Sequence, residues 1–132
     1  MLKSHQNNLN QLVIYQKSID IFKLSRHIAS YISYDKDILT MHKSLKKSDH
    51  YASNLVMDAL GLVPKIVETE NQKNPKLKLK YAKSLHLLID RLNKNCSRLE
   101  HTKTNGIDFL KLLRKELKKL QYIHKNYVNS ML

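Results

Sequence analysis

The 132-residue sequence contains only two glycines and two prolines. Folds built from strands and tight turns need many positions with positive φ and many rigid corners, which these two residue types supply. Their scarcity argues against such folds and favours long helices joined by a few short loops. With 42% hydrophobic residues the chain is not compositionally disordered, and its length suits a single domain with its own core.

Cysteine and long apolar runs are also scarce. The single Cys96 cannot form an internal disulfide, which fits a reducing compartment. No stretch approaches the roughly 18 uncharged apolar residues that a membrane-spanning helix needs. Residues 1–11 lack the apolar segment of a signal peptide. We therefore expect a cytoplasmic protein that does not associate with a membrane.

Acidic residues are few, since 11 Asp and Glu stand against 24 Lys and Arg and give a formal charge of +13. The excess lies in the second half of the chain. Residues 76–132 hold fourteen basic and four acidic residues, a net charge of +10, whereas residues 1–75 carry a net charge of +3. A solvated surface normally mixes both signs, so this imbalance indicates an acidic partner. RNA or DNA is the simplest such partner.

Apolar residues recur at spacings of three and four along four segments of the chain. These spacings predict helices over about 9–34, about 36–70 with a bend near Pro64, about 75–100 and about 107–130. The third helix has the clearest start, because Asn74 can cap it and Pro75 suits its first turn. The second has the most regular repeat, formed by Ile38, Met41, Leu45, Ser48, Ala52, Leu55, Ala59, Leu62 and Ile66.

Four apolar stripes of similar length, joined by short connections, pack most simply as antiparallel helices. The predicted fold class is therefore all-α, a single up-down-up-down four-helix bundle domain over residues 1–132. Leu79, Leu87 and Leu112 fall at positions outside the predicted core. They would leave apolar surface for a second copy of the chain, so we expect an oligomer.

Patterns typical of catalysis or metal binding are nearly absent. The two glycines stand alone, and no Glu-x-x-His or His-x-x-x-His spacing occurs among the seven histidines. The carboxylate pairs Asp35/Asp37 and Glu68/Glu70 are two residues apart, which directs them to different faces of a helix. We predict a protein that is not an enzyme and has no catalytic residues, metal site or cofactor.

Three single residues have both a structural and a functional interpretation. His124 falls in the apolar register of the fourth helix, where a hydrogen-bonded histidine is a more common role than a ligand or base. Cys96 falls in the register of the third helix and is expected to be a small core residue. Tyr122 lies among lysines and could stack on an unpaired base, although tyrosines in bundles more often lie at the core boundary.

Basic residues recur at helical spacing on the third and fourth predicted helices, opposite the leucines. At 3.6 residues per turn they stay on one side of each helix, so we expect a solvent-facing surface that binds phosphates. A single surface lysine ordinarily does no more than solvate its helix. The scarcity of carboxylates among these cations favours binding. The predicted nucleic-acid-binding residues are Lys76, Lys80, Lys83, Arg91, Lys94 and Arg98 on the third helix, and Lys111, Arg114, Lys115, Lys118, Lys119 and Lys125 on the fourth.

Two short segments resemble a group of small bacterial four-helix bundle proteins. Residues 13–18 (VIYQKS) are similar to an aromatic-Gln-Lys-Ala start, and residues 85–92 (LHLLIDRL) to a Leu-Asp-x-Leu-Arg stretch. The group includes the 23S ribosomal RNA intervening-sequence proteins and the accessory variability determinant (Avd) of diversity-generating retroelements. Residues 54–61 match the Asn-x-x-Glu-Gly pattern of intervening-sequence members only in part, so the resemblance to Avd is closer.

The resemblance implies a homopentameric barrel of four-helix protomers that binds a reverse transcriptase and its template RNA. It also implies an accessory role without catalysis by the chain itself. The alternative is a non-enzymatic structural or protein-interaction bundle of the intervening-sequence type, whose positive charge meets an acidic protein. The residues alone leave open whether RNA or DNA is preferred.

Overall fold

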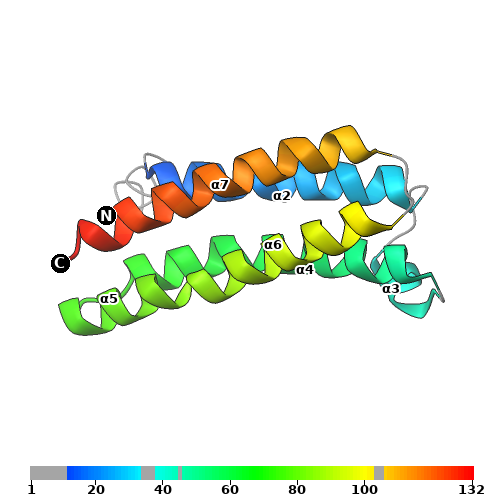
Figure 1. The fold of residues 1–132 in the computed structure, drawn as a ribbon. Coiled ribbons are helices and arrows are strands. Elements are labelled where there is room, and N and C mark those ends of the chain that lie inside the picture. Colours follow the sequence, from blue (N-terminus) through cyan, green and yellow to red (C-terminus); the bar gives the residue numbers. More distant parts are fainter. Residues whose placement is uncertain (1–11, 34–37, 45, 103–105) are drawn as a thin grey trace.

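The computed structural model describes residues 12–33, 38–44, 46–102 and 106–132. All regular structure in these ranges is helical, and four long helical segments pack together as a bundle (Figure 1). This confirms the predicted all-helical class. No helix in the described ranges is long and apolar enough to cross a bilayer. The helices are α2 (Val13–Ile32), α3 (Ile38–Lys43), α4 (Lys47–Glu70), α5 (Pro75–Ser84), α6 (His86–His101) and α7 (Ile107–Asn129).

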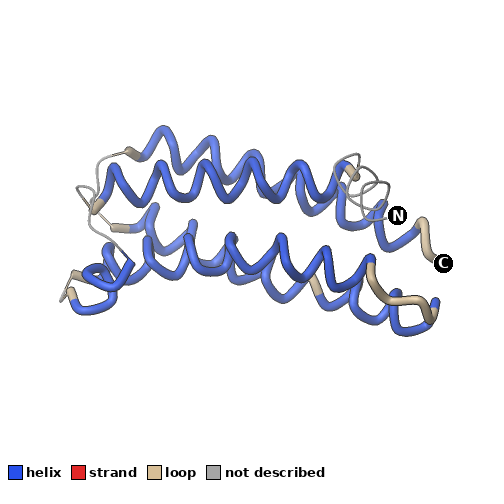
Figure 2. Tube along the Cα trace, turned by 180° about the vertical axis from the view of Figure 1, so that it is seen from behind, coloured by secondary structure: helices blue, strands red, loops and turns tan. Residues whose placement is uncertain are grey.

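The helices lie in two layers, with α2 beside α7 in one and α4 beside α5 and α6 in the other (Figures 1 and 2). Around the bundle, α2 contacts α4 and α7, and α6 contacts the same two helices. The core fills the space between the layers because each helix turns its leucine or isoleucine stripe inward. Its largest fully buried side chains are Ile21, Ile28, Leu55, Leu62, Ile66, Leu85, Leu92, Leu99, Leu110, Leu113, Leu117 and Leu120.

The predicted second helix is interrupted near its start. The chain leaves the helical conformation at Ser44, and Lys46 is extended. Ser44 supports the turn, because its Oγ accepts a hydrogen bond from the Lys46 amide at 3.1 Å and its carbonyl oxygen accepts one from His50 Nε2. The buried Asp49 accepts a hydrogen bond from Ser33 Oγ at 2.8 Å. The prediction of one helix was wrong here because these contacts break a segment whose apolar repeat continues.

Beyond this turn, α4 agrees with the predicted repeat. Ala52, Leu55, Ala59, Leu62 and Ile66 are all buried. The helix runs without interruption through Pro64, which is exposed. A proline ring removes one backbone donor from the helix, and at an exposed position solvent can reach the carbonyl that loses its partner.

The predicted third helix is present as α5 and α6, with Leu85 as a turn residue between them. Asn74 caps α5 as predicted, since its Oδ1 accepts hydrogen bonds from the amides of Lys76 at 2.9 Å and Leu77 at 3.3 Å. At the junction, the Leu85 amide donates to the Ala82 carbonyl at 3.3 Å. This i to i−3 bond tightens the helix by a local 3₁₀-type turn without redirecting it.

The fourth predicted helix is α7. It follows Gly106, whose φ of 86° is a left-handed conformation that glycine adopts without a Cβ clash. The candidate caps Thr104 and Asn105 lie outside the described residues. His124 Nε2 donates a hydrogen bond to the Ala82 carbonyl at 2.8 Å and so joins α7 to α5. This confirms the predicted hydrogen-bonded role of the histidine.

Small polar side chains occur inside the bundle on α2 and α4, the two helices with the most extensive contact. Ser18 and Ser25 of α2 and Ser53 of α4 are fully buried. Their hydroxyl oxygens have no hydrogen-bond partner within the described part of the chain. Ala52 and Ala59 of α4 are fully buried as well. Side chains of this size allow two helix backbones to approach closely.

Candidate nucleic-acid interface

One row of side chains follows the outer side of α7. Lys111, Lys115, Lys118, Tyr122 and Lys125 recur at spacings of four and three residues, which places them on one face of the helix. All five are exposed. At a rise of 1.5 Å per residue, the row is about 21 Å long. Its four lysines have no ion-pair partner among the described residues. We call this row the α7 stripe.

Ion pairs on both edges of α7 fix which side of the helix faces outward. Towards α6, Arg114 Nη2 lies 2.6 Å from Glu100 Oε1. Towards α2, Lys17 Nζ lies 2.7 Å from Glu116 Oε2. The hydrogen bond from Lys17 lowers the pKa of Glu116, so this carboxylate stays charged to a lower pH than usual. Lys119 is also near Glu116, at 3.4 Å, so Arg114 and Lys119 have carboxylate partners that the α7 stripe lacks.

A groove of about 510 Å³ lies between α2 and α7, beside Tyr122. Tyr122 is 68% exposed. Lys17 reaches this groove from α2. It was not among the predicted residues, because helical spacing does not connect it to residues of α7 that are distant in the sequence. Apolar surface from the tyrosine and Ile123 therefore lies beside several ammonium groups. The groove is lined by Lys17, Lys118, Lys119, Tyr122 and Ile123.

A second groove, of about 430 Å³, joins the basic residues of α5 to the α7 stripe. Lys83 of α5 and Lys125 of α7 both line it, together with His86 and His124. Both histidines are held by backbone carbonyls, His86 Nδ1 donating to Lys83 at 2.8 Å and His124 to Ala82. The predicted residues of α5 and α7 therefore meet here. Lys76 and Lys80 are exposed further towards the start of α5.

The basic residues of α6 lie in a different place. Arg91, Lys94 and Arg98 line a groove of about 430 Å³ between α6 and α4, together with Asn54, Asp58 and Asn95. Asn95 Nδ2 donates a hydrogen bond to Asp58 Oδ2 at 3.1 Å. Burial raises the pKa of Asp58, while Arg91 and this hydrogen bond oppose the rise. The Arg98 guanidinium lies 5.7 Å from the Tyr51 ring centre. This groove carries both signs of charge.

The twelve predicted residues therefore do not form one continuous surface. Those of α5 and α7 adjoin each other, whereas Arg91, Lys94 and Arg98 border α4 and Arg114 is paired with Glu100. Spacing along a helix fixes where a side chain lies relative to its own leucines. Spacing does not fix how a helix is rotated about its axis relative to its neighbours. In α6 this rotation turns Arg91, Lys94 and Arg98 towards α4.

Cys96 is buried between α6 and α7. Its Sγ lies 3.4 Å from Glu100 Oε1 and 3.6 Å from the Leu110 carbonyl oxygen. Burial, followed by the nearby Glu100, raises the pKa of the thiol to about 12. Such a thiol is protonated at neutral pH and therefore a poor nucleophile. Over the ranges that the structure describes, no group of three or more His, Cys, Asp or Glu side chains is placed to hold a metal ion.

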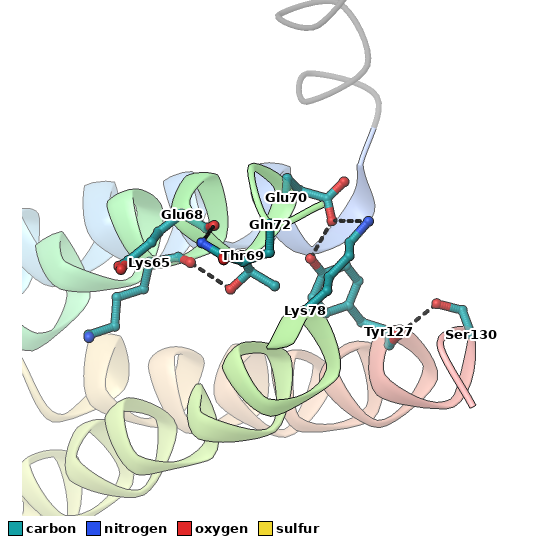
Figure 3. A network of polar contacts seen from close by, with 8 residues as sticks. All are labelled: Lys65, Glu68, Thr69, Glu70, Gln72, Lys78, Tyr127 and Ser130. Carbon is teal, nitrogen blue, oxygen red and sulfur yellow. Dashed lines mark hydrogen bonds and ion pairs between the residues drawn. The ribbon is translucent and has the colours of Figure 1, made fainter. Parts of the chain in front are cut away.

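A polar network joins the end of α4 to α5 and α7 (Figure 3). The Tyr127 hydroxyl donates a hydrogen bond to Glu70 Oε2 at 2.6 Å, and Lys78 Nζ lies 3.4 Å from the same oxygen. Burial, and then the Glu70 carboxylate, raise the pKa of Tyr127 far above its usual range. Lys78 is thereby engaged within the bundle, whereas Lys76 and Lys80 beside it are exposed.

The α7 stripe thus presents four lysines without carboxylate partners in the described ranges, beside an exposed aromatic ring. Comparisons with protein-family models, curated proteins and solved structures gave no match.

Proposed function

We propose that this protein is a non-enzymatic accessory protein that binds RNA or DNA through the α7 stripe and the adjoining lysines of α5. The α7 stripe carries the proposal, because its four lysines extend over about 21 Å without a carboxylate partner in the described ranges. Neutralised phosphates release counterions, which makes such binding strongly dependent on salt.

The regular spacing of the stripe supports a nucleic acid over an acidic protein. A nucleic acid presents one negative charge per nucleotide along a line, and lysines on one face of a helix present cations along a line. A protein partner is bound through an interface whose core is apolar and depleted of charge, unlike a row of lysines. The Tyr122 ring within the stripe adds a surface on which a base can stack.

The resemblance to Avd-like proteins extends the proposal to a diversity-generating retroelement. The nucleic acid would then be the template RNA, the protein partner a reverse transcriptase, and the compartment the cytoplasm. We assign the groove between α4 and α6 to the protein partner. It combines Arg91 and Arg98 with Asp58 and two asparagine side chains, which suits a protein surface with both signs of charge better than a run of phosphates.

We further propose an up-down-up-down topology and a homopentamer. The sequence colours run in opposite directions along successive long helices in Figure 1, which supports this topology. Leu87 on α6 is 54% exposed and Leu112 on α7 is 44% exposed. Two apolar positions on different helices suit a head-to-tail interface, in which one surface of a copy meets another surface of the next. Such an interface generates a ring when the rotation between copies closes, as it does in a pentamer.

Charge reversal in the α7 stripe tests the binding proposal. Lys111→Glu, Lys115→Glu and Lys118→Glu, made together, should weaken RNA binding and lower the slope of log affinity against log salt by about 2 to 3, because three phosphate contacts are lost. Fluorescence anisotropy of a labelled RNA oligonucleotide at several salt concentrations measures both the affinity and the salt slope. Circular dichroism should show an unchanged helical fold, since all three side chains are exposed.

The matched control places the same change of charge elsewhere. Lys23→Glu, Lys47→Glu and Lys65→Glu alter exposed positions of α2 and α4. This variant should keep most of the RNA affinity and salt slope of the wild type. Equal losses in both variants, or unchanged binding in the stripe variant, would refute a specific role for the α7 stripe. Saturable binding to an acidic protein without binding to RNA would favour the protein-interaction alternative.

A further inference from the structure

Tyr122 is the most exposed tyrosine among the described residues, since Tyr31, which is 51% exposed, packs its ring edge-on against Phe109. Tyr15, Tyr51 and Tyr127 are partly buried and pack against the core. Tyr122 has no such packing and is 68% exposed near the middle of the C-terminal half of α7. An aromatic ring placed in the core stabilises a fold through its large apolar area, and this one contributes little in that way. Its ring face is available to a ligand.

The surroundings of the ring are cationic. Lys118 lies one turn earlier on the same face of α7, and Lys17 and Lys119 line the same groove. The nearest described carboxylate on this part of α7, Glu116, is already engaged by Lys17 at 2.7 Å and by Lys119 at 3.4 Å. The three lysines and Glu116 together carry three positive charges and one negative charge. A ligand that sits on the ring therefore meets a net positive potential.

A flat aromatic face beside cations has the chemistry that a nucleotide needs. Each base has a π face that stacks on an aromatic side chain, and the adjoining phosphates pair with lysines. In a duplex the bases are paired and stacked on one another inside the helix. An outward ring on a convex α-helix cannot reach a base face there, whereas it can in a single strand or loop.

From this arrangement we infer that Tyr122 is a stacking platform for one unpaired base, and that the groove between α2 and α7 selects single-stranded over double-stranded nucleic acid. This inference rests on the proposed function and deepens it, because it assigns the form of nucleic acid and the residue that recognises it. The flanking phosphate is bound by Lys118, which lies one turn before the ring and lines the same groove. Because every base has a π face, recognition at Tyr122 does not depend on sequence.

The test compares Tyr122→Leu with Tyr122→Phe. The probe is a single-stranded RNA containing the fluorescent base 2-aminopurine, with the matching DNA strand and the duplex of the same sequence as further arms. Wild type and the phenylalanine variant should bind the single strands at least about fivefold more tightly than the leucine variant. All three proteins should bind the duplex equally. Since no charge changes, the salt slope should not change either.

The fluorescence of 2-aminopurine gives a second readout that needs no variant. Stacking on Tyr122 should quench it when wild-type protein binds either single strand, and the quenching should disappear in Tyr122→Leu. Binding without quenching by the wild type, or equal single-strand affinities of wild type and Tyr122→Leu, would overturn the stacking platform. The stripe reversal Lys111→Glu, Lys115→Glu and Lys118→Glu would still weaken binding in that case, so failure of the platform is distinguishable from failure of the proposed function.

Discussion

Replacing Tyr127 with phenylalanine removes one hydroxyl from the network that joins α4, α5 and α7 (Figure 3). That hydroxyl donates to the Glu70 carboxylate at 2.6 Å, and the Glu70 side chain is only 17% exposed. A hydrogen bond to a charged group contributes about 1.5 to 3 kcal/mol. Lys78 remains near Glu70 after the substitution, which limits the cost of the lost donor. We therefore expect the free energy of unfolding to fall by about 2 kcal/mol at neutral pH.

The same substitution should change how stability depends on alkaline pH. The pKa of Tyr127 is raised in the folded protein, whereas an unfolded tyrosine titrates near 10. Below about pH 10 the phenol is protonated in both the folded and the unfolded protein, so its hydrogen bond makes its full contribution to the free energy of unfolding. Above it, the unfolded state releases the proton while the folded state keeps it. The free energy of unfolding of the wild type then falls, relative to that of Tyr127→Phe, by up to about 1.4 kcal/mol per pH unit.

Urea unfolding followed by circular dichroism, at neutral pH and in steps towards pH 11, measures both effects. The stability advantage of wild type over Tyr127→Phe should narrow above about pH 10. Tyr122→Phe is the matched control, because that hydroxyl is exposed, and its unfolding free energy at neutral pH should stay within about 0.5 kcal/mol of wild type. Equal stability of Tyr127→Phe and wild type at neutral pH, with parallel alkaline profiles, would show that the hydrogen bond does not form in solution.

Two further predictions concern the thiol and the assembly. Native protein near neutral pH should react slowly with iodoacetamide at Cys96, because its pKa is raised to about 12, and rapidly once unfolded in urea. Mass spectrometry checks this, and equal rates in both states would contradict a buried, protonated thiol. Multi-angle light scattering should give the mass of five copies of the 15.5 kDa chain. A monomer at micromolar concentration would contradict the proposed ring.

Periodicity predicted most of the fold because helix and core depend on the same local pattern. The buried positions of α4 from Ala52 to Ile66 and the cap at Asn74 follow from spacing and cap chemistry alone. The turn at Ser44 did not, because the Ser33–Asp49 hydrogen bond connects residues far apart in sequence. The apolar spacing along the third predicted helix also includes Leu77 as a core position, but this residue is 43% exposed. Ala82 is the first buried residue of α5. Leu77 precedes it, so the apolar repeat begins before the part of the helix that contacts the core.

The candidate site was only partly accessible to sequence reasoning. The lysines of the α7 stripe were predicted, because they share one helix and a fixed angular step. The separation of Arg91 and Arg98 from this stripe was not, because it depends on how α6 is rotated against α4. The pairing of Arg114 with Glu100 depends likewise on the contact between two helices. A charge count gives the number of cations in a segment, but it does not show which side chains each cation contacts in the folded protein.

The three buried serines of α2 and α4 show that the core at these positions accepts only small side chains. Ser18, Ser25 and Ser53 lie where a hydroxyl gains no partner in the described structure, so an alanine would fill almost the same space without a polar group to desolvate. A leucine at any of these positions would have to force the two backbones apart. Homologous chains that keep this packing should therefore carry alanine or serine at these sites, should seldom carry glycine because it weakens a helix interior, and should exclude branched side chains.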